Sequence, residues 1–414
     1  MMKRVVVTGI GAVTPIGNDV ESMWKNLIKG KHGIDVIDRF DIDGFENHLA
    51  AEVKGYDPLL YMSRKDVNRY DPYTVFGVGA ACQAMENSKI DGTVPKERFG
   101  VYFSSVMGGL SAVERGIAAL TEKGSSRVSS YTVPAMITNT AAGAIAMKYG
   151  CRASCMSIST ACASSSNAVG EAYRCIKHGY ADAVIAGGAD AAITPFGIAS
   201  LNACNAMSRS DDPDRASIPF DAERDGFVLG EGSGALVLEE YEHAKKRGAY
   251  IYGEICGYGS TCDAFNMVAP MPDADMAAKA VKYALQEAEQ DFGPTEGGIY
   301  INAHGTATRL NDKMETIAIK KGLGLERAYE SIVSSTRSMT GHLLGGAGAV
   351  EAIISLLVLR RKDIPPTAGY KVEDDMCDLD ICANEARHAD IELTLSNSFG
   401  FGGHNSCIAF RDTE

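Results

Sequence analysis

Cys162, His304 and His342 lie in sequence contexts that suit chemistry better than packing. Cys162 stands in the run "SISTACASSSNAVG", where its neighbours are too small to cover a sulfur atom. His304 in "INAHGTAT" and His342 in "SMTGHLLGGAG" each stand beside a glycine, which lets a substrate come close. A thiolate is a nucleophile, and an imidazole can act as its partner. These residues therefore predict covalent catalysis at Cys162.

A turn between a strand and a helix is expected to carry Cys162. The run "CMSIST" (155–160) is typical of a strand, and "ASSSNAVGEAYRCIKHG" (163–179) is typical of a helix. Free N–H groups and the helix dipole at the first turn stabilise a thiolate, so we expect a lowered pKa for this thiol. A buried packing cysteine is the alternative, although core cysteines usually lie inside an element rather than at its start.

Two glycine-rich runs have different interpretations. The run "NSFGFGGHNS" (397–406) can turn backbone N–H groups toward a developing oxyanion, and a plain turn is the alternative. The run "GIGAVTPIG" (9–17) has Thr14 where a dinucleotide-binding fingerprint needs its third glycine. We therefore expect no nicotinamide or flavin cofactor.

Apolar runs of strand length alternate with longer segments of helical spacing, which predicts an α/β architecture. Two stretches have the same plan, because a strand, a reactive side chain and a small-residue helix follow one another around Cys162 and again around His342. The runs "FVLGEGSGALVLEE" and "FGFGGHNSCIAF" form a second pair, because each places a glycine-rich turn before a strand. We infer two pseudo-repeated halves, 1–252 and 253–414, that face one another. Chance likeness of glycine-rich turns is the alternative.

Composition excludes several classes of protein. The 414 residues carry a formal net charge of −13, which argues against a nucleic-acid partner. The eleven cysteines show no C-x-x-C spacing, so neither a metal site nor a disulfide framework is expected. No run is long enough to cross a membrane, and glycines interrupt the first apolar run before it could act as a secretion signal. We expect a soluble cytoplasmic protein.

Four motifs along the chain carry a family resemblance. The motifs "TACASS", "NAHGTAT", "SSTRSMTGHLLGGAGAVEA" and "NSFGFGG" occur in the order and spacing of the elongating β-ketoacyl-[acyl-carrier-protein] synthases of the type II kind. The run "FDAERDGFVLGEGSGALVLEEYEHAKKRGA" is similar as well, and the resemblance covers nearly the whole chain. Taken together these motifs are highly specific.

The resemblance implies a fold, a reaction and partners. The fold would be α/β, thiolase-like, with five layers αβαβα, in a homodimer. The activity would be that of a 3-oxoacyl-[acyl-carrier-protein] synthase, a decarboxylative Claisen condensation in fatty acid elongation. No resident cofactor or metal is implied, because the substrates travel on the phosphopantetheine of acyl carrier protein.

The resemblance also assigns roles to single residues. Cys162 would carry the acyl chain, and neutral His304 and His342 would stabilise the enolate that decarboxylation produces. The N–H groups of Cys162 and Phe401 would form the oxyanion hole, and Phe401 would be a gating aromatic. Three residues would contact the substrate: Thr306 and Thr308 at the phosphopantetheine arm, and Met107 as the limit on acyl length. Four basic residues would dock the carrier protein at the mouth of the substrate tunnel: Arg64, Lys65 and Arg69, with Arg209 as a further candidate.

The chain departs from the family at three positions. Arg337 stands where lysine is usual, and because arginine keeps its proton we expect it to organise Glu351, and Glu315 as a second candidate, rather than transfer protons. His404 replaces a threonine in the glycine-rich loop, and Ile218 replaces an arginine. These changes put the substrate in doubt.

Four other functions are alternatives. A specialised polyketide or polyene synthase is the main competitor. A thiolase would use a second cysteine, and Cys407 is not obviously placed for that role. A cysteine–histidine hydrolase would form no carbon–carbon bond. A non-catalytic chain-length partner, which belongs to another functional class, would lack the nucleophile, and the presence of Cys162 argues against it.

Overall fold

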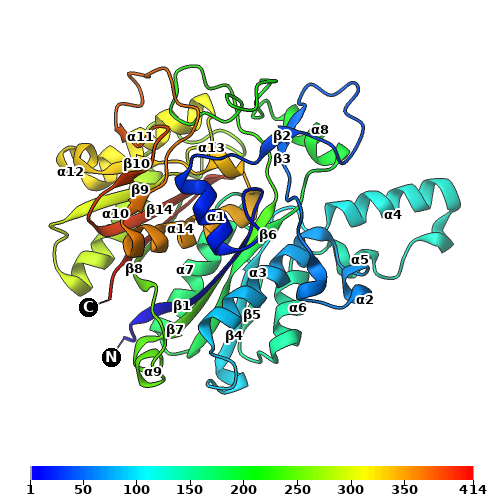
Figure 1. Ribbon diagram of the computed structural model, residues 1–414, viewed down its shortest axis with the longest axis horizontal. Helices are drawn as coiled ribbons and strands as arrows, with labels where there is room; N and C mark the ends of the chain where they lie inside the picture. The colour runs from blue at the N-terminus through cyan, green and yellow to red at the C-terminus, as the bar shows by residue number, and fades with distance from the viewer. Residues whose placement is uncertain (1, 414) are drawn as a thin grey trace.

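A computed structural model describes residues 2–413, and its largest feature is one mixed sheet with eleven strands (Figure 1). The first half of the chain supplies β1 (Val5–Val13), β4 (Phe99–Ser104), β5 (Cys155–Met156), β6 (Ala183–Asp190) and β7 (Gly232–Glu240). The second half supplies β8 (Gly253–Cys262), β9 (Gly298–Asn302), β10 (Ile332–Ser334), β12 (Asp380–Ile381), β14 (Ile391–Gly400) and β15 (His404–Arg411).

The strand order repeats between the two halves. Along the sheet the first half runs β5-β4-β6-β7-β1, and the second half runs β10-β9-β14-β15-β8, with β12 added at its edge. If β12 is left out and the strands of each half are ranked by their place in the chain, the two orders are the same. In each set the first three strands pair in parallel and the last two are antiparallel. The predicted pseudo-repeat is therefore confirmed. The boundary between residues 252 and 253 stays a prediction.

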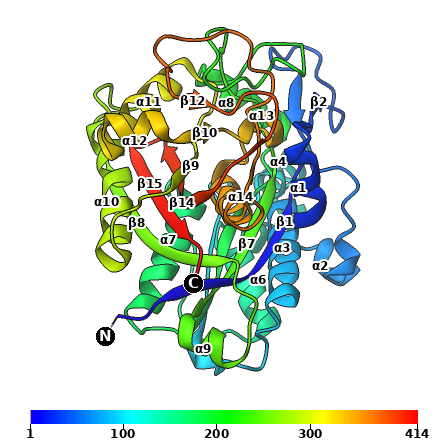
Figure 2. The ribbon, with the colours of Figure 1, turned by 60° about the vertical axis from the view of Figure 1, so that its left-hand side comes forward.

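Two buried helices separate the two parts of the sheet. Helices α7 (Ser164–Lys177) and α14 (Ala347–Arg361) contact strands of both halves and each other. Residues 347–359 of α14 are all buried, as expected of a helix whose apolar side chains cover every face. On the outer faces, α3 (Pro72–Ser88) and α6 (Thr140–Tyr149) cover the first half, while α10 (Asp275–Phe292) covers the second and carries α11 (Arg309–Leu323). The five-layered αβαβα fold is confirmed (Figure 2).

An arm projects from the first half beyond the layers (Figure 1). It consists of α4 (Leu110–Lys123), the 3-10 helix η3 (Ser125–Arg127) and α5 (Thr132–Met136). Apolar side chains along it and just after it are exposed: Ile117, Leu120, Tyr131, Val133, Met136 and Ile137. In a monomer this surface faces water.

The remaining elements are short and connect the layers. The helices are α1 (Val20–Ile28), η1 (Pro58–Leu60), α2 (Arg64–Val67), η2 (Lys96–Arg98), α8 (Pro195–Ala203), α9 (Tyr241–Lys246), α12 (Leu325–Glu330), α13 (Arg337–Thr340) and η4 (Leu344–Gly346). Two small sheets pair β2 (Ile34–Val36) with β3 (Leu49–Ala51) and β11 (Asp363–Ile364) with β13 (Arg387–His388).

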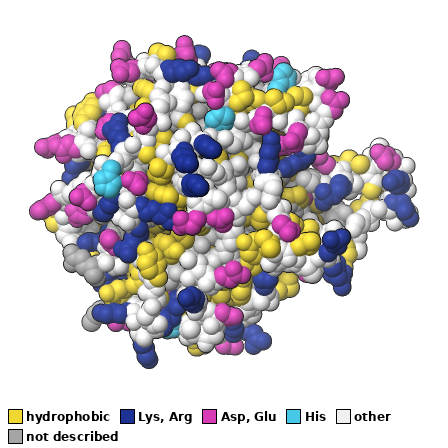
Figure 3. Space-filling model, viewed as in Figure 1, with side chains coloured by type: hydrophobic (Ala, Val, Ile, Leu, Met, Phe, Trp, Pro, Cys, Tyr) yellow, Lys and Arg dark blue, Asp and Glu magenta, His cyan; other side chains and the backbone are white. Residues whose placement is uncertain are grey.

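The distribution of surface charge and the length of the apolar helices are relevant to nucleic-acid and membrane partners. Acidic and basic side chains are interspersed over the face shown in Figure 3. Between residues 2 and 413, none of the helices combines the length and the apolar character needed to cross a bilayer.

Candidate active site

Cys162 lies on a strained turn just before α7. Ala161 has φ +49°, a left-handed conformation that costs free energy for a residue with a Cβ. Ser164 holds this turn, since its hydroxyl donates to the carbonyl of Ala161 at 2.6 Å and accepts from the N–H of Thr160 at 2.8 Å. The strand expected over 155–160 is shorter, because the chain leaves the sheet after Met156 to make the turn. The position resembles a nucleophile elbow, where strain presents the reacting atom.

His342 occupies the matching turn of the second half. Its N–H donates to the carbonyl of Val228 at 2.8 Å, and its own carbonyl accepts from the N–H of Gly230 at 3.0 Å. The expected helix does not begin directly after it, because the 3-10 helix η4 intervenes and α14 begins at Ala347. Backbone hydrogen bonds from the first half therefore hold this histidine in place.

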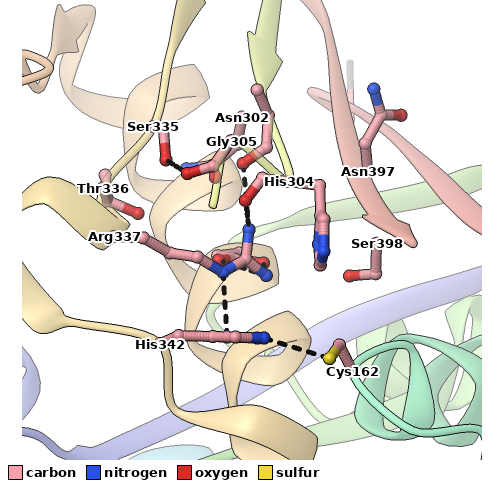
Figure 4. A network of polar contacts seen from close by, with 12 residues as sticks. Cys162, Asn302, His304, Gly305, Ser335, Thr336, Arg337, His342, Asn397 and Ser398 are labelled. Atoms are coloured by element: carbon pink, nitrogen blue, oxygen red, sulfur yellow. Dashed lines mark hydrogen bonds and ion pairs between the residues drawn. The ribbon is translucent and has the colours of Figure 1, made fainter. Parts of the chain in front are cut away.

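The three reactive side chains meet between the halves (Figure 4). The Nε2 atom of His342 lies 3.0 Å from Sγ of Cys162. The rings of His304 and His342 are perpendicular, with centroids 5.7 Å apart. One ring nitrogen of each histidine and Sγ all lie within 4.8 Å of one another. The structure thus brings together the three residues that the sequence singled out.

The pKa of Cys162 runs opposite to the expectation. Burial raises the pKa of this thiol to about 11, while the charge of Arg337 and the N–H groups of Phe401 and of Cys162 itself oppose the rise. A helix terminus is worth about 1 kcal/mol to a nearby charge, whereas removing a charge from water costs several kcal/mol, so desolvation wins. The expected lowering was wrong. The resting state is a neutral thiol that meets two N–H groups, as an oxyanion site requires.

Both histidines are neutral. Burial lowers the pKa of each well below its usual value, and the charge of Arg337 lowers it further. His342 adds to the effect on His304. A neutral imidazole keeps one N–H group, so each ring next to the sulfur can donate one hydrogen bond to an oxyanion.

A buried charged network supports the histidines from behind. Arg337, which is 1% exposed, forms an ion pair with Glu351 at 2.9 Å. Glu315 accepts from the N–H groups of His304 and Gly305 at 2.8 and 2.7 Å. Burial raises the pKa of both glutamates to about 7. The expected contact of Arg337 with Glu351 is present, whereas Glu315 touches the backbone of the His304 turn instead.

A cavity of about 430 Å³ leads to the sulfur. Its lining is mostly apolar and includes Cys162, His304 and His342. Four other predicted site residues line it as well: Met107, Thr306, Thr308 and Phe401. The two threonine hydroxyls lie 3.1 Å apart. An apolar cavity with a few polar groups at its reacting end suits an acyl chain on a polar carrier arm.

The predicted docking residues belong to segments other than the cavity walls. Arg64 and Lys65 are exposed on α2, and the guanidinium of Arg69 lies 4.8 Å from the ring centre of Tyr131 at the base of the arm. Arg209 is paired with Glu46 at 3.3 Å. None of the four basic residues is among those that line the cavity.

The two other departures from the family are also outside the cavity lining. His404 begins β15, and its ring lies beside Gly402 of the glycine-rich loop. Ile218 is buried next to Ser217, whose hydroxyl donates to the carbonyl of Arg337 at 2.9 Å.

Asp190 is a site residue that the sequence reasoning missed. This buried carboxylate accepts from the N–H groups of Val106, Met107 and Gly345 at 2.7 to 3.0 Å, and from the hydroxyl of Ser105 at 2.7 Å. It thereby ties one wall of the cavity to η4, just after His342. An acidic residue at the end of the apolar run "DAVIAGGAD" was the available signal.

Among residues 2–413, the cluster of Cys162, His304 and His342 has ligand atoms close enough together to hold a metal ion. The permanent charge of Arg337 lies against both histidines and opposes a second cation there. The arrangement therefore fits acyl chemistry better than metal binding.

Comparisons with known proteins agree with this geometry. The model of the β-ketoacyl synthase N-terminal domain matches residues 2–244, and that of the C-terminal domain matches residues 252–371. The chain is 46% identical to 3-oxoacyl-[acyl-carrier-protein] synthase 2 of Synechocystis sp. over 99% of this chain and 98% of that one. It is 44% identical to the enzyme of the same name from Vibrio harveyi, again over 99% and 98% of the two chains.

Solved structures give the same result. A β-ketoacyl synthase from Burkholderia phymatum superposes with a TM-score of 0.91 at 34% identity, over all of both chains. A type II polyketide ketosynthase, solved in complex with its acyl-carrier protein, superposes with a TM-score of 0.90 at 33% identity, also over all of both chains. The chain belongs to the β-ketoacyl synthase family.

Proposed function

We propose that this protein is a 3-oxoacyl-[acyl-carrier-protein] synthase that elongates fatty acyl chains by decarboxylative condensation. The observation that carries the proposal is the meeting of one thiol and two neutral imidazoles at the end of an apolar cavity. The thiol can hold an acyl group, and the imidazoles can hold an enolate.

In the first step Cys162 takes the acyl chain. Its sulfur attacks the thioester carbonyl, and the N–H groups of Cys162 and Phe401 receive the oxyanion. The bond to the carrier thiol then breaks, and that thiol leaves with the proton of Cys162. The acyl chain extends along the apolar walls, which include Met107.

In the second step malonyl thioester loses carbon dioxide. The electron pair of the broken carbon–carbon bond becomes an enolate, whose oxygen accepts hydrogen bonds from His304 and His342. The enolate carbon attacks the acyl-cysteine, the carbon–sulfur bond breaks, and the Cys162 thiolate that leaves takes up a proton from the solvent. Thr306 and Thr308 hold the phosphopantetheine arm. Because the electrons come from malonate, the reaction needs no resident cofactor.

Fatty acid elongation is favoured over polyketide synthesis by the comparisons. The relatives named 3-oxoacyl-[acyl-carrier-protein] synthase 2 are 42 to 46% identical to this chain, whereas the ketosynthases of polyketide and related systems are 33% identical or less. A non-catalytic partner role is not favoured, since the thiol faces the cavity.

The carrier protein would dock beside the arm. Arg64, Lys65 and Arg69 present positive charge there, and the structural relative solved with its acyl-carrier protein supports a carrier partner. We expect charge reversal of Arg64 and Lys65 together to raise KM for the carrier-bound substrate about tenfold while leaving small thioester substrates unaffected.

The protein would act as a homodimer in the cytoplasm. The arm exposes apolar side chains, and β5 has an open edge where its counterpart β10 is covered by β12. A second copy would cover both features. All eleven cysteines are free, which suits a reducing compartment.

The decisive experiment supplies acyl-carrier thioesters of graded length with malonyl-carrier protein, and analyses the products by mass spectrometry. A 3-oxoacyl product two carbons longer than the acyl donor supports the proposal. Free fatty acid as the only product would show hydrolysis instead.

A further inference from the structure

Arg337 donates hydrogen bonds in three directions from its buried position (Figure 4). Its Nε points at Nδ1 of His342, 3.3 Å away. Its Nη1 donates to the carbonyl of His304, and its Nη2 donates to Glu351 at 3.0 Å. The guanidinium therefore touches both histidines and one carboxylate at once.

The first of these hydrogen bonds determines where the proton of His342 lies. Arginine has no acceptor atom and stays protonated, so Nδ1 of His342 must be the acceptor. Among the residues that the structure describes, Nδ1 has no other hydrogen-bond partner. The neutral ring then carries its proton on Nε2, the atom that lies 3.0 Å from Sγ of Cys162.

We propose that Arg337 is a positioning residue that locks His342 in the Nε2–H tautomer. His342 is thereby a permanent hydrogen-bond donor to the sulfur and then to the substrate oxygen, and it cannot accept the thiol proton. The functional part of this inference rests on the proposed function, whereas the tautomer itself does not.

Lysine at this position is a matched probe of the lock. Counted along the side chain, a lysine places a methylene group where arginine has Nε, and its ammonium lies one atom further out. Arg337→Lys therefore keeps the positive charge near His304 and Glu351 but removes the donor that faces Nδ1 of His342.

The direct test observes the ring itself. Protein labelled with ¹⁵N-histidine is studied by long-range proton–nitrogen NMR, and the His342 signals are assigned by their loss in His342→Gln. We expect only the Nε2–H form in the wild type and a mixture of both neutral forms in Arg337→Lys. A ring that stays entirely Nε2–H in Arg337→Lys would overturn the lock, whatever reaction the protein catalyses.

The functional test is a double-mutant cycle on the acylation of Cys162. Glutamine in place of His342 carries an amide that donates from about the position of Nε2 and has no tautomer to choose. We expect Arg337→Lys to slow acylation about tenfold or more when His342 is present. In the His342→Gln background the same change should alter the rate by less than about twofold. Equal losses in both backgrounds would show that Arg337 acts by another route.

A third comparison remains if Arg337→Lys does not fold. Glutamine reaches the position of Nε2, whereas asparagine reaches only that of Nδ1. A donor role for His342 predicts that His342→Gln acylates faster than His342→Asn, with equal thermal stability as the control. Equal loss of acylation in both variants would indicate a proton acceptor and overturn the proposal.

Discussion

Cys162 in the first half and His342 in the second half follow a left-handed residue, Ala161 with φ +49° and Gly341 with φ +65°. Each precedes a central helix, α7 or α14. The supports differ, because the Ser164 hydroxyl holds the backbone turn that carries Cys162, whereas a buried ion pair stands behind the imidazole of His342. The repeated backbone therefore places each reactive residue before a central helix, and the side chains around that residue determine its chemistry.

The segments that follow β4 and β9 show the same contrast. Asp190 accepts from the N–H groups of Val106 and Met107, and Glu315 accepts from those of His304 and Gly305. In both halves a buried carboxylate therefore holds two consecutive N–H groups. Under the proposed function, one segment would present an apolar wall to the acyl chain, and the other would present a polar donor to the malonyl group.

The largest effect is expected from Cys162→Ala. Acyl-enzyme should no longer form, and condensation should fall by at least about 10³-fold, because the sulfur that takes the acyl group beside the two histidines is removed. Malonyl decarboxylation should remain measurable, since both histidines stay in place. Mass spectrometry of the intact protein measures the adduct, and circular dichroism controls for folding. An acyl adduct on the variant would show that a different residue is the nucleophile.

A pair of glycine variants would distinguish the contributions of the two halves to the reaction. A Cβ at Gly400 would lie 2.6 Å from the carbonyl of Thr160, and one at Gly230 would lie 2.5 Å from that of Thr340. Gly400→Ala should therefore displace Cys162, and Gly230→Ala should displace His342. Each displacement should cost about 10 to 10²-fold in one partial reaction.

The two partial reactions are measured separately in these variants. We expect Gly400→Ala to slow acylation more than decarboxylation, and Gly230→Ala to do the reverse. Both variants should lose about 1 to 3 kcal/mol of unfolding free energy through overpacking. If both partial reactions fell equally in each variant, the division of labour between the halves would be wrong.

The pH dependence of thiol alkylation tests how the sulfur differs from the imidazoles. Burial raises the pKa of Cys162 to about 11, so the thiolate fraction grows as the pH rises toward that value. The alkylation rate by iodoacetamide should then increase about tenfold per pH unit between neutral pH and pH 10. Peptide mapping must resolve the site, because Cys155, Cys204 and Cys262 are exposed. A rate that is level above neutral pH would show a thiol whose pKa is lowered instead.

Much of the site could be predicted because the motifs lie where elements end. Cys162 and His342 stand before small-residue helices, and glycines mark the turns that approach them. Helix α14 and the layers follow from apolar runs whose length and period are visible in the sequence. Local pattern was therefore enough to single out Cys162, both histidines and the repeat.

The rest depends on distances across the fold. The pKa of Cys162 follows from how much protein surrounds it, which the helix-start pattern does not contain. Asp190 was missed because its partners Val106 and Gly345 come from two distant segments. The role of Arg337 toward His342 also required the direction of one N–H group.

The smallest effect is expected at Met107, which belongs to the segment held by Asp190. Changing its side chain should alter the preferred length of the acyl chain. Met107 lines the cavity, and its N–H is held by Asp190, so its side chain can change while its backbone stays. Met107→Ala should favour acyl chains one two-carbon step longer, and Met107→Phe one step shorter. Each buried methylene contributes about 0.8 kcal/mol, so relative rates for neighbouring lengths should shift about tenfold. Mass spectrometry of the product lengths measures this preference. The rate of malonyl decarboxylation is the control and should not change. A changed rate would mean that the apolar wall and the polar donors are not independent.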